Sequence, residues 1–220
     1  MTQNYEHQPR KRFGQNFLHD QNIINKIISN FNPKAGQAIL EIGPGMGALT
    51  EKLLAQLNHL YLVEIDKNLA EVLIEKYQER ITLFNYDILK FDLTNIKLDS
   101  EQKIRIIGNL PYNISTPILF HLFKFIELIS DMSFMLQLEV VDRMVAEPNT
   151  KAYGRLSVMT QFYCYVEKLF TIPNTAFRPM PKVKSAIVQL IPKPVDSTVN
   201  AQLLSEIVRD AFNQDRKSVV

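Results

Sequence analysis

Cysteine and long apolar runs are scarce in this chain of 220 residues. Cys164 is its one cysteine, which excludes an intramolecular disulfide framework and a cysteine-rich metal site. No run approaches the roughly 18 apolar residues that a membrane-spanning helix needs. The opening segment MTQNYEHQPRKRFG has basic residues but no apolar run after them, unlike a secretory signal. We therefore expect a cytoplasmic protein that does not contact membranes.

Histidine is also rare, and the spacing of the four histidines fits no metal site, so we expect no bound metal. Neither sign of charge dominates, because 25 Lys+Arg against 23 Asp+Glu leave a net charge of +2. Hydrophobic residues make up 46% and charged residues 22%, which excludes a disordered chain. The length fits one domain, or one domain with a small appendage.

The basic residues that do stand out form two groups near the ends of the chain. They are Arg10, Lys11 and Arg12 in the first group, and Arg178, Lys182 and Lys184 in the second. Such groups are able to neutralise phosphates. On charge alone, a solvated tail and a solvated strand edge explain them better.

Short apolar runs alternate with helical stretches from residue 20 to residue 164. We expect strands over 38–42, 59–65, 81–86, 103–109 and 133–138, and helices over 20–31, 47–57, 67–79, 117–129, 139–146 and 155–164. This alternation predicts the α/β class, with a mostly parallel, doubly wound sheet that helices cover on both faces.

The pattern changes after residue 164. Two apolar runs, 165–172 and 183–191, are joined by a proline-rich loop without a helix, which predicts an antiparallel hairpin at the sheet edge. We expect residues 1–194 to form the main domain. Residues 195–220 then begin a small C-terminal helical domain, which the chain leaves incomplete.

A glycine-rich turn, EIGPGMGALT over residues 41–50, follows the first expected strand and precedes a helix. Glycines in such a turn allow the backbone to approach a ligand closely. Gly43, Gly45 and Ala48 fit the dinucleotide pattern G-x-G-x-x-G/A, so an NAD-dependent dehydrogenase is one interpretation. Gly43, Gly45 and Gly47 also fit the loop E-x-G-x-G-x-G of Rossmann-like methyltransferases that use S-adenosylmethionine. The turn indicates a nucleoside cofactor and leaves its identity open.

Acidic residues follow the next two expected strands. Glu64 ends the second strand, where a carboxylate accepts hydrogen bonds from ribose hydroxyls. Asp66, two residues later, is the second choice for that role. Asp87 follows the third strand, and its position fits either an acceptor for an adenine amino group or the N-cap of a helical turn.

The fourth expected strand ends in Asn109-Leu110-Pro111-Tyr112. Ligands bind at the carboxyl ends of strands in an open parallel sheet. The Asn109 side-chain oxygen and the Leu110 carbonyl are two acceptors for the N–H groups of an exocyclic amine. Pro111 fixes the turn, and Tyr112 presents a face on which a base stacks. Together they suit charge that develops on an amine during methyl transfer. A plain turn at the end of a strand is the simpler alternative.

Four segments occur in the order typical of one family: Gly14–Leu18 (GQNFL), Glu41–Gly47 (EIGPGMG), Asn109–Thr116 (NLPYNIST) and Phe177–Ser185 (FRPMPKVKS). From about Arg10 to its end, the chain resembles the small-subunit ribosomal RNA adenine N6-dimethyltransferases. The resemblance implies a Rossmann-like fold and S-adenosylmethionine as cofactor. It also implies that two adjacent adenines, in a hairpin loop near the 3′ end of small-subunit ribosomal RNA, are methylated on a pre-30S-type particle during ribosome assembly.

The resemblance also implies roles for individual residues. The implied cofactor ligands are Asn16, Leu18, Gly43, Gly45, Glu64, Asp87 and Asn109. The implied catalytic group is Asn109, Leu110, Pro111 and Tyr112, with Phe177 as a second aromatic that closes over the flipped adenine. The implied RNA contacts are Arg10, Lys11, Arg12, Arg178, Lys182 and Lys184. On the residues alone, an aromatic in a proline-rich loop is more often a loop anchor.

Two alternatives share these motifs. One is a related methyltransferase that modifies large-subunit ribosomal RNA and confers antibiotic resistance. The other is a noncatalytic RNA-binding assembly factor on the same fold. The intact glycine turn and Asn109–Tyr112 favour retained catalysis, and a monomer is the default state.

Overall fold

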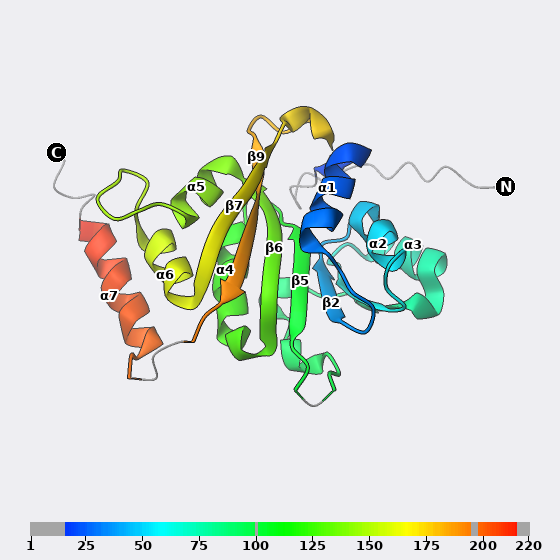
Figure 1. Ribbon diagram of the computed structural model, residues 1–220, viewed down its shortest axis with the longest axis horizontal. Helices are drawn as coiled ribbons and strands as arrows, with labels where there is room; N and C mark the ends of the chain where they lie inside the picture. Colours follow the sequence, from blue (N-terminus) through cyan, green and yellow to red (C-terminus); the bar gives the residue numbers. More distant parts are fainter. Residues whose placement is uncertain (1–15, 100, 195–197, 215–220) are drawn as a thin grey trace.

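The computed structural model describes residues 16–99, 101–194 and 198–214, and within these ranges a seven-stranded sheet organises the chain (Figure 1). The strands are β2 (Ala38–Ile42), β3 (Leu60–Val63), β4 (Ile81–Phe84), β5 (Ile104–Asn109), β6 (Ile129–Gln137), β7 (Cys164–Ile172) and β9 (Ser185–Pro192). Their order in the sheet is β4-β3-β2-β5-β6-β9-β7. The first five strands in this order pair in parallel, and β9 pairs antiparallel with both β6 and β7. The predicted α/β class and the antiparallel edge are confirmed.

Helices cover both faces of the sheet (Figure 1). They are α1 (Gln21–Phe31), α2 (Ala48–Leu54), α3 (Lys67–Tyr77), α4 (Ser115–Leu122), α5 (Leu138–Met144), α6 (Arg155–Tyr163) and α7 (Ala201–Gln214). One hydrophobic cluster packs α4, α5 and α6 on one face, and a second cluster packs α1, α2 and α3 on the other. This arrangement is the doubly wound one that the strand–helix alternation predicts.

Capping hydrogen bonds and short 3-10 segments determine where several helices and strands begin. Asp20 caps α1, because its side chain accepts hydrogen bonds from the backbone N–H groups of Asn22 and Ile23. The helix expected over 117–129 begins two residues earlier than predicted: α4 starts at Ser115, and Ile114 at its N-cap makes no side-chain capping bond. Strand β6 begins at Ile129, four residues before the expected start, because a short 3-10 segment replaces the end of the expected helix 117–129.

A small second sheet was not expected from the sequence. β1 (Phe17–Leu18) pairs antiparallel with β8 (Phe177–Arg178), and the backbone N–H of His19 donates to the carbonyl of Ala176. Two-residue strands carry no readable periodicity, so only the fold reveals this pairing. It joins the start of the described chain to the loop before β9.

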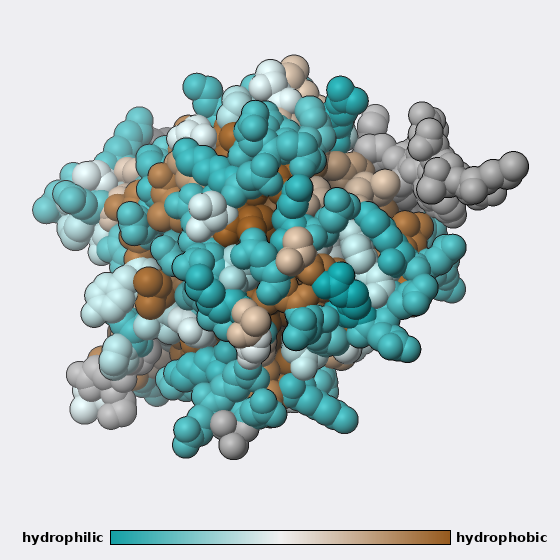
Figure 2. Space-filling model, turned by 45° about the vertical axis from the view of Figure 1, so that its right-hand side comes forward, coloured by the Kyte–Doolittle hydropathy of each residue, from teal (hydrophilic) through white to brown (hydrophobic). Residues whose placement is uncertain are grey.

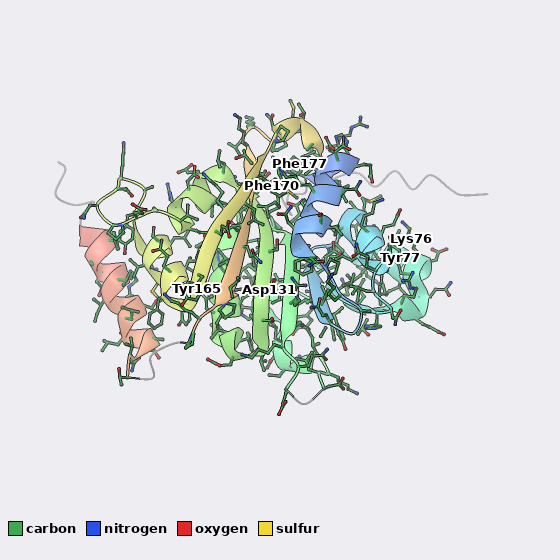
Figure 3. The ribbon with its side chains drawn as sticks, in the orientation of Figure 1. Lys76, Tyr77, Asp131, Tyr165, Phe170 and Phe177 are labelled. Atoms are coloured by element: carbon green, nitrogen blue, oxygen red, sulfur yellow. The ribbon has the colours of Figure 1, made fainter. Side chains whose placement is uncertain are left out.

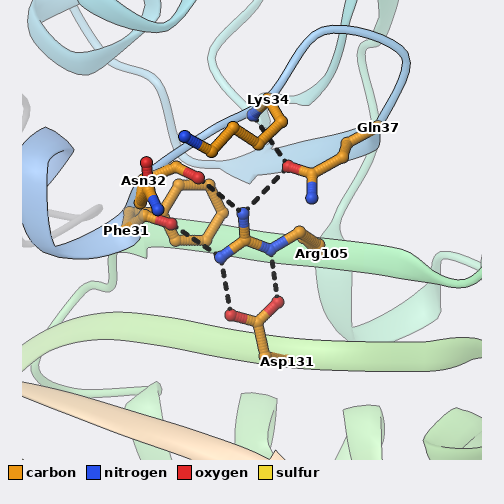
Figure 4. A network of polar contacts seen from close by, with 6 residues as sticks. All are labelled: Phe31, Asn32, Lys34, Gln37, Arg105 and Asp131. Atoms are coloured by element: carbon orange, nitrogen blue, oxygen red, sulfur yellow. Dashed lines mark hydrogen bonds and ion pairs between the residues drawn. The ribbon is translucent and has the colours of Figure 1, made fainter.

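The Arg105 guanidinium joins one end of α1 to the middle of the sheet (Figure 4). Its Nε and one terminal nitrogen donate to the two carboxylate oxygens of Asp131, over 2.6 and 2.9 Å. Its remaining donors reach the backbone carbonyls of Phe31 and Asn32 and the side-chain oxygen of Gln37. The guanidinium also lies 4.1 Å from the centre of the Phe31 ring. Each of the five donors therefore has an acceptor, as a buried cation requires.

Hydrophilic and hydrophobic residues are both exposed at the surface of the protein. On the face in Figure 2, hydrophilic side chains predominate and hydrophobic residues emerge in separate groups between them. No helix in the described ranges is long and apolar enough to cross a bilayer.

We expect Asp131→Asn to lower the free energy of unfolding by about 3 kcal/mol, because it removes the charged partner of Arg105, whose side chain is only 14% exposed. Urea denaturation measures this loss. The matched control is Asp142→Asn, which breaks an ion pair with Lys168 whose side chains are 44% and 39% exposed. Its loss is expected to stay below about 1 kcal/mol. Equal losses for the two variants would contradict the anchoring role of Arg105.

Candidate functional site

A pocket of about 300 Å³ opens at the carboxyl ends of β2, β3 and β5. It brings together ten of the residues that the sequence singles out: Asn16, Leu18, Gly43, Gly45, Glu64, Asp87, Asn109, Leu110, Pro111 and Tyr112. These residues come from five separate stretches of the chain. Their convergence fits the rule that ligands of an open α/β sheet bind beyond the carboxyl ends of its strands.

The glycine turn has the backbone geometry that glycine alone adopts readily. Gly43, Gly45 and Gly47 all have positive φ angles, of 66°, 58° and 82°. Two of these glycines also have close neighbours: a Cβ atom would come within 3.1 Å of the Phe17 ring at Gly45, and within 3.1 Å of the Leu73 side chain at Gly47. The Phe17 ring therefore lies against the turn because residue 45 has no side chain.

A further glycine, Gly108, allows the strands β2 and β5 to approach at the pocket floor. A Cβ atom at Gly108 would lie 2.5 Å from the backbone oxygen of Ile42, a distance that real contacts do not reach. Gly108 stands opposite Ile42 in the parallel ladder and directly precedes Asn109. The sequence analysis missed this residue, although a glycine inside an apolar strand is a recognised sign of close backbone approach.

Glu64 is 5% exposed, and both of its carboxylate oxygens hold backbone donors. Oε2 accepts from the Gly45 N–H over 3.1 Å, and Oε1 accepts from the Asp66 N–H over 2.9 Å. Burial raises the pKa of Glu64, while these two hydrogen bonds lower it. Glu64 thus ties the glycine turn after β2 to the end of β3.

The other two acids differ in position. Asp66 is 1% exposed, is absent from the pocket lining and caps α3 by accepting from the Asn68 N–H. The second choice for a ribose acid is therefore a helix cap. Asp87 is the N-cap that its position predicts, because its Oδ1 accepts from the Leu89 N–H at the start of a 3-10 turn. It also lines the pocket, so its contact with an adenine amino group stays a prediction.

Glu41 is a carboxyl group that the sequence analysis assigned to no site. It is 1% exposed, it lines the pocket, and its Oε2 accepts a 2.7 Å hydrogen bond from the hydroxyl of the fully buried Thr50. Burial and the nearby charge of Glu64 raise the pKa of Glu41 to about 8, against the opposing effect of the Thr50 hydrogen bond. The sequence did contain a signal for this residue, because an acidic residue within an apolar run such as AILEI is unusual.

Asn109 and Tyr112 are each held by a distant segment. The Asn109 side-chain Nδ2 donates to the backbone carbonyl of Asn16 over 2.9 Å. The Tyr112 hydroxyl is 2.6 Å from the hydroxyl of Ser185, which is fully buried at the start of β9. Burial raises the pKa of Tyr112. Both side chains are therefore oriented before any ligand arrives.

Phe177 lies away from the pocket, which corrects the expected role of an aromatic that closes over a base. It is 1% exposed, belongs to the hydrophobic cluster of α1, α2 and α3, and is absent from the pocket lining (Figure 3). Its backbone pairs with that of Leu18. Phe177 is a loop anchor because its ring is already enclosed by the core.

Hydrophobic side chains that the sequence analysis did not select also line the pocket. Met46, Ile65 and Tyr86 are 41%, 46% and 53% exposed, and they follow β2, β3 and β4. Exposed apolar residues in one pocket suit a flat, partly apolar ligand such as a purine. Isolated residues in loops carry no pattern that marks them in the sequence.

The expected basic residues divide into two sets. Arg178, Lys182 and Lys184 are exposed in the loop between β7 and β9. Arg10, Lys11 and Arg12 lie outside the described residues. Within the described ranges, no group of three or more His, Cys, Asp or Glu residues is arranged to hold a metal ion.

The chain is similar to known proteins over most of its length. Residues 6–220 match the family model described as ribosomal RNA adenine dimethylase. The chain is 50% identical to "Ribosomal RNA small subunit methyltransferase A" of Actinobacillus pleuropneumoniae serotype 5b, and the match covers 97% of this chain and 76% of the relative.

Two solved structures share the fold and part of the sequence. A dimethyladenosine transferase from Plasmodium falciparum superposes with a TM-score of 0.78 at 29% identity, covering 90% of this chain and 70% of that one. The 23S rRNA methyltransferase ErmE superposes with a TM-score of 0.71 at 27% identity, covering 90% of this chain and 79% of that one. On the match of residues 6–220, together with the 50% identity, the chain belongs to the ribosomal RNA adenine dimethylase family.

Proposed function

We propose that this chain transfers methyl groups to the N6 atoms of two adjacent adenines in a hairpin loop near the 3′ end of small-subunit ribosomal RNA, on a pre-30S-type particle. The observation that carries this proposal is the pocket itself, which joins the glycine turn, Glu64 and Asn109–Tyr112 in one cavity. The chain is 50% identical to a small-subunit methyltransferase but 27% identical to the large-subunit enzyme ErmE. This difference favours the small subunit as the source of the RNA.

The donor groups of the pocket suit S-adenosylmethionine, which supplies an electrophilic methyl group when bound. The Glu64 carboxylate has further lone pairs for ribose hydroxyls beyond those that accept from the Gly45 and Asp66 N–H groups. Asp87 accepts from the adenine amino group, and the exposed side chains of Met46, Ile65 and Tyr86 pack on the purine. Asn16 and Leu18 cover the cofactor from β1. An NAD-dependent dehydrogenase leaves Asn109–Tyr112 without a role, and the family match does not support one.

Asn109 holds the target amine. Its Nδ2 is engaged by the Asn16 carbonyl, so its Oδ1 is the end of the amide that accepts from an N–H group. The Leu110 carbonyl is the second acceptor, and Pro111 keeps it in place. Two acceptors favour the pyramidal, increasingly positive nitrogen of the transition state over the flat amine of the free base. After transfer, the nitrogen loses its proton to water, and no side chain is required as a general base.

Tyr112 is the stacking residue. An adenine inside a duplex is out of reach, so the enzyme takes a base that has left its stack. The hydrogen bond to Ser185 holds the Tyr112 ring against the pocket that it lines, and we assign the face of this ring to the base. Phe177 contributes indirectly, by holding β8 against β1.

The remaining assignments concern RNA docking and domain organisation. Arg178, Lys182 and Lys184, together with Arg10–Arg12, bind RNA phosphates around the pocket. We assign residues 1–194 to the methyltransferase domain and 195–220 to a small helical domain. Helix α7 of the latter packs beside α6 (Figure 1). The chain acts as a monomer.

Asn109→Ala is expected to reduce methyl transfer by at least about 100-fold, because it removes an acceptor that acts mainly in the transition state. The assay measures tritium transfer from S-adenosylmethionine to unmethylated small ribosomal subunits. Cofactor affinity, measured by calorimetry, is expected to stay nearly unchanged. Loss of both activity and cofactor affinity would instead make Asn109 a cofactor or folding residue, and unchanged transfer would contradict its role in holding the amine.

Two substitutions at Tyr112 separate its ring from its hydroxyl. Tyr112→Ala is expected to weaken productive RNA binding by about 5- to 150-fold, the range for one lost base–aromatic stack. Tyr112→Phe keeps the ring and loses only the Ser185 hydrogen bond, so we expect less than about a tenfold effect. The measurement is the KM for the ribosomal particle. Equal effects of the two variants would contradict stacking.

Salt is expected to weaken RNA binding steeply, because neutralised phosphates release counterions. The measurement is the affinity for the particle between 50 and 200 mM KCl, a range over which about 6 phosphate contacts reduce affinity roughly 1,000-fold. The double variant Lys182→Gln/Lys184→Gln is expected to make the plot of log affinity against log salt concentration less steep, by the amount due to about two phosphate contacts. A flat salt response would contradict these basic contacts.

A further inference from the structure

The segment 178–184 connects two residues of the pocket wall. At its start, Arg178 pairs with Phe17 in the small β1–β8 sheet. Directly after its end, the Ser185 hydroxyl lies 2.6 Å from the Tyr112 hydroxyl. Phe17 and Tyr112 both line the pocket. The segment therefore adjoins the pocket at both of its ends, and we call it the rim loop.

The rim loop combines positive charge with exposed apolar side chains. Its sequence, RPMPKVK, contains three cations and no acid. Met180 is 62% exposed and Val183 is 44% exposed. Single exposed apolar residues are common on protein surfaces, but two in one short basic loop form an apolar surface with cations around it. A ligand that matches both properties carries negative charges and apolar faces, as RNA does with its phosphates and bases.

Contacts on the inner side of the rim loop keep Met180 on the outside. The next residue, Pro181, is buried, and its carbonyl accepts a hydrogen bond from the Asn174 side-chain amide over 3.3 Å. Near the end of the loop, the Lys184 carbonyl accepts from the Leu138 N–H over 2.9 Å. Prolines on both sides of Met180 further restrict the backbone. The loop is therefore largely ordered before RNA binds, which lowers the entropy cost of a contact made by Met180.

The proposed reaction requires an apolar group beside the target base. An adenine that leaves its stack leaves a gap, and its neighbours are able to close that gap and so oppose entry into the pocket. Proteins that unstack bases insert apolar side chains between them, and methionine is one of those used. Tyr112 is assigned to the adenine inside the pocket, so it does not fill the gap. Met180 is the most exposed apolar side chain of the loop that adjoins Tyr112.

We propose that Met180 is a wedge, which inserts against the base next to the target adenine and fills the gap that the adenine leaves on entering the pocket. This inference rests on the proposed function and names the residue that keeps the RNA open during methyl transfer. The unbranched thioether side chain of methionine adapts its shape to such a gap. Arg178 and Lys182, on either side of Met180, bind the flanking phosphates.

The first experiment compares side chains at position 180 in methyl transfer to unmethylated small ribosomal subunits. Met180→Gln keeps the length of the side chain but makes it polar, and we expect it to lower kcat/KM about tenfold. Met180→Leu keeps an apolar side chain of similar volume and is expected to stay within about twofold of the wild type. The matched control is Ile74→Gln, on the 50% exposed Ile74 of α3, which is absent from the pocket lining. It is expected to behave like the wild type.

The salt dependence of binding separates a wedge from a loss of electrostatic contacts. Met180 carries no charge, so Met180→Gln is expected to keep the wild-type slope of log affinity against log salt concentration. The double variant Lys182→Gln/Lys184→Gln is the contrasting case, because it removes two cations from the same loop. A shallower slope in Met180→Gln would show that the substitution displaces the cations of the rim loop, and it would contradict the wedge.

A second substrate tests insertion between bases. Small subunits in which one of the two target adenines is replaced by uracil place the other adenine beside a base that stacks more weakly. Less stacking then has to be broken, so the loss caused by Met180→Gln is expected to shrink from about tenfold to about threefold or less. Equal losses on the two particles would show a contact with RNA that is not a wedge, and would overturn the proposal.

The same assays distinguish failure of the wedge from failure of the proposed function. Wild-type kcat/KM in Met180→Gln would overturn the wedge and leave the proposed function intact. Failure of the wild-type chain to methylate the unmodified particle would overturn the proposed function and the wedge with it. Thermal unfolding checks that each variant is folded, and we expect little change because Met180 and Ile74 are both exposed.

Discussion

The pocket depends on the close approach of β2 and β5 at their carboxyl ends. Gly108 permits it, because any side chain there would meet the backbone oxygen of Ile42 at 2.5 Å. The approach places the glycine turn beside Asn109: a Cβ atom at Gly43 would lie 3.8 Å from the Asn109 carbonyl oxygen. The glycine turn and the turn at Asn109, to which we assign the cofactor and the target amine, follow adjacent strands. Wider strand spacing would therefore separate the methyl donor from its acceptor.

Hydrogen bonds between distant segments then hold the reactive side chains in place. The Arg105 guanidinium fastens α1 to β5 and β6, and the β1–β8 pair fastens the start of the described chain to the loop before β9. Asn109 and Tyr112 each take one partner from these fastened segments, Asn16 and Ser185 respectively. Neutral hydrogen-bond acceptors are able to stabilise a transition state when they are already oriented before the substrate binds. The side chains then do not have to reorganise during the reaction.

The sequence predicts the sheet and most of the pocket because both depend on local patterns. Apolar runs and turn residues locate β2 and β5 to within a residue, and the spacing from Gly43 to Glu64 places the acid on the next strand. The β1–β8 pair and the Tyr112–Ser185 hydrogen bond could not be predicted, since they join segments far apart in the chain through very few residues. Phe177 was misjudged for a related reason: its motif shows that it matters, but only packing shows that its ring lies inside the core. Glu41 stands within the predicted motif, and only its burial distinguishes it from a solvated acid.

The distribution of charge separates the two ligands that this family must bring together. The described basic residues around the site, Arg178, Lys182 and Lys184, are exposed on a loop, whereas Glu41 and Glu64 are buried inside the pocket. We expect the exposed cations to attract the phosphates of RNA to the outer surface, whereas the described residues that line the pocket include carboxyl groups and no cation. An unstacked base, which carries no phosphate, is therefore the part of the RNA that suits the pocket. A cationic cofactor instead favours the ionised form of the carboxyl groups beside it. The negatively charged RNA and the positively charged cofactor are therefore expected at different depths in the protein. The lysines and the arginine lie in water at the surface, where they attract RNA over long range. The carboxyl groups of Glu41 and Glu64 lie in the pocket, where burial makes an ionised carboxylate unfavourable unless a cation is bound beside it.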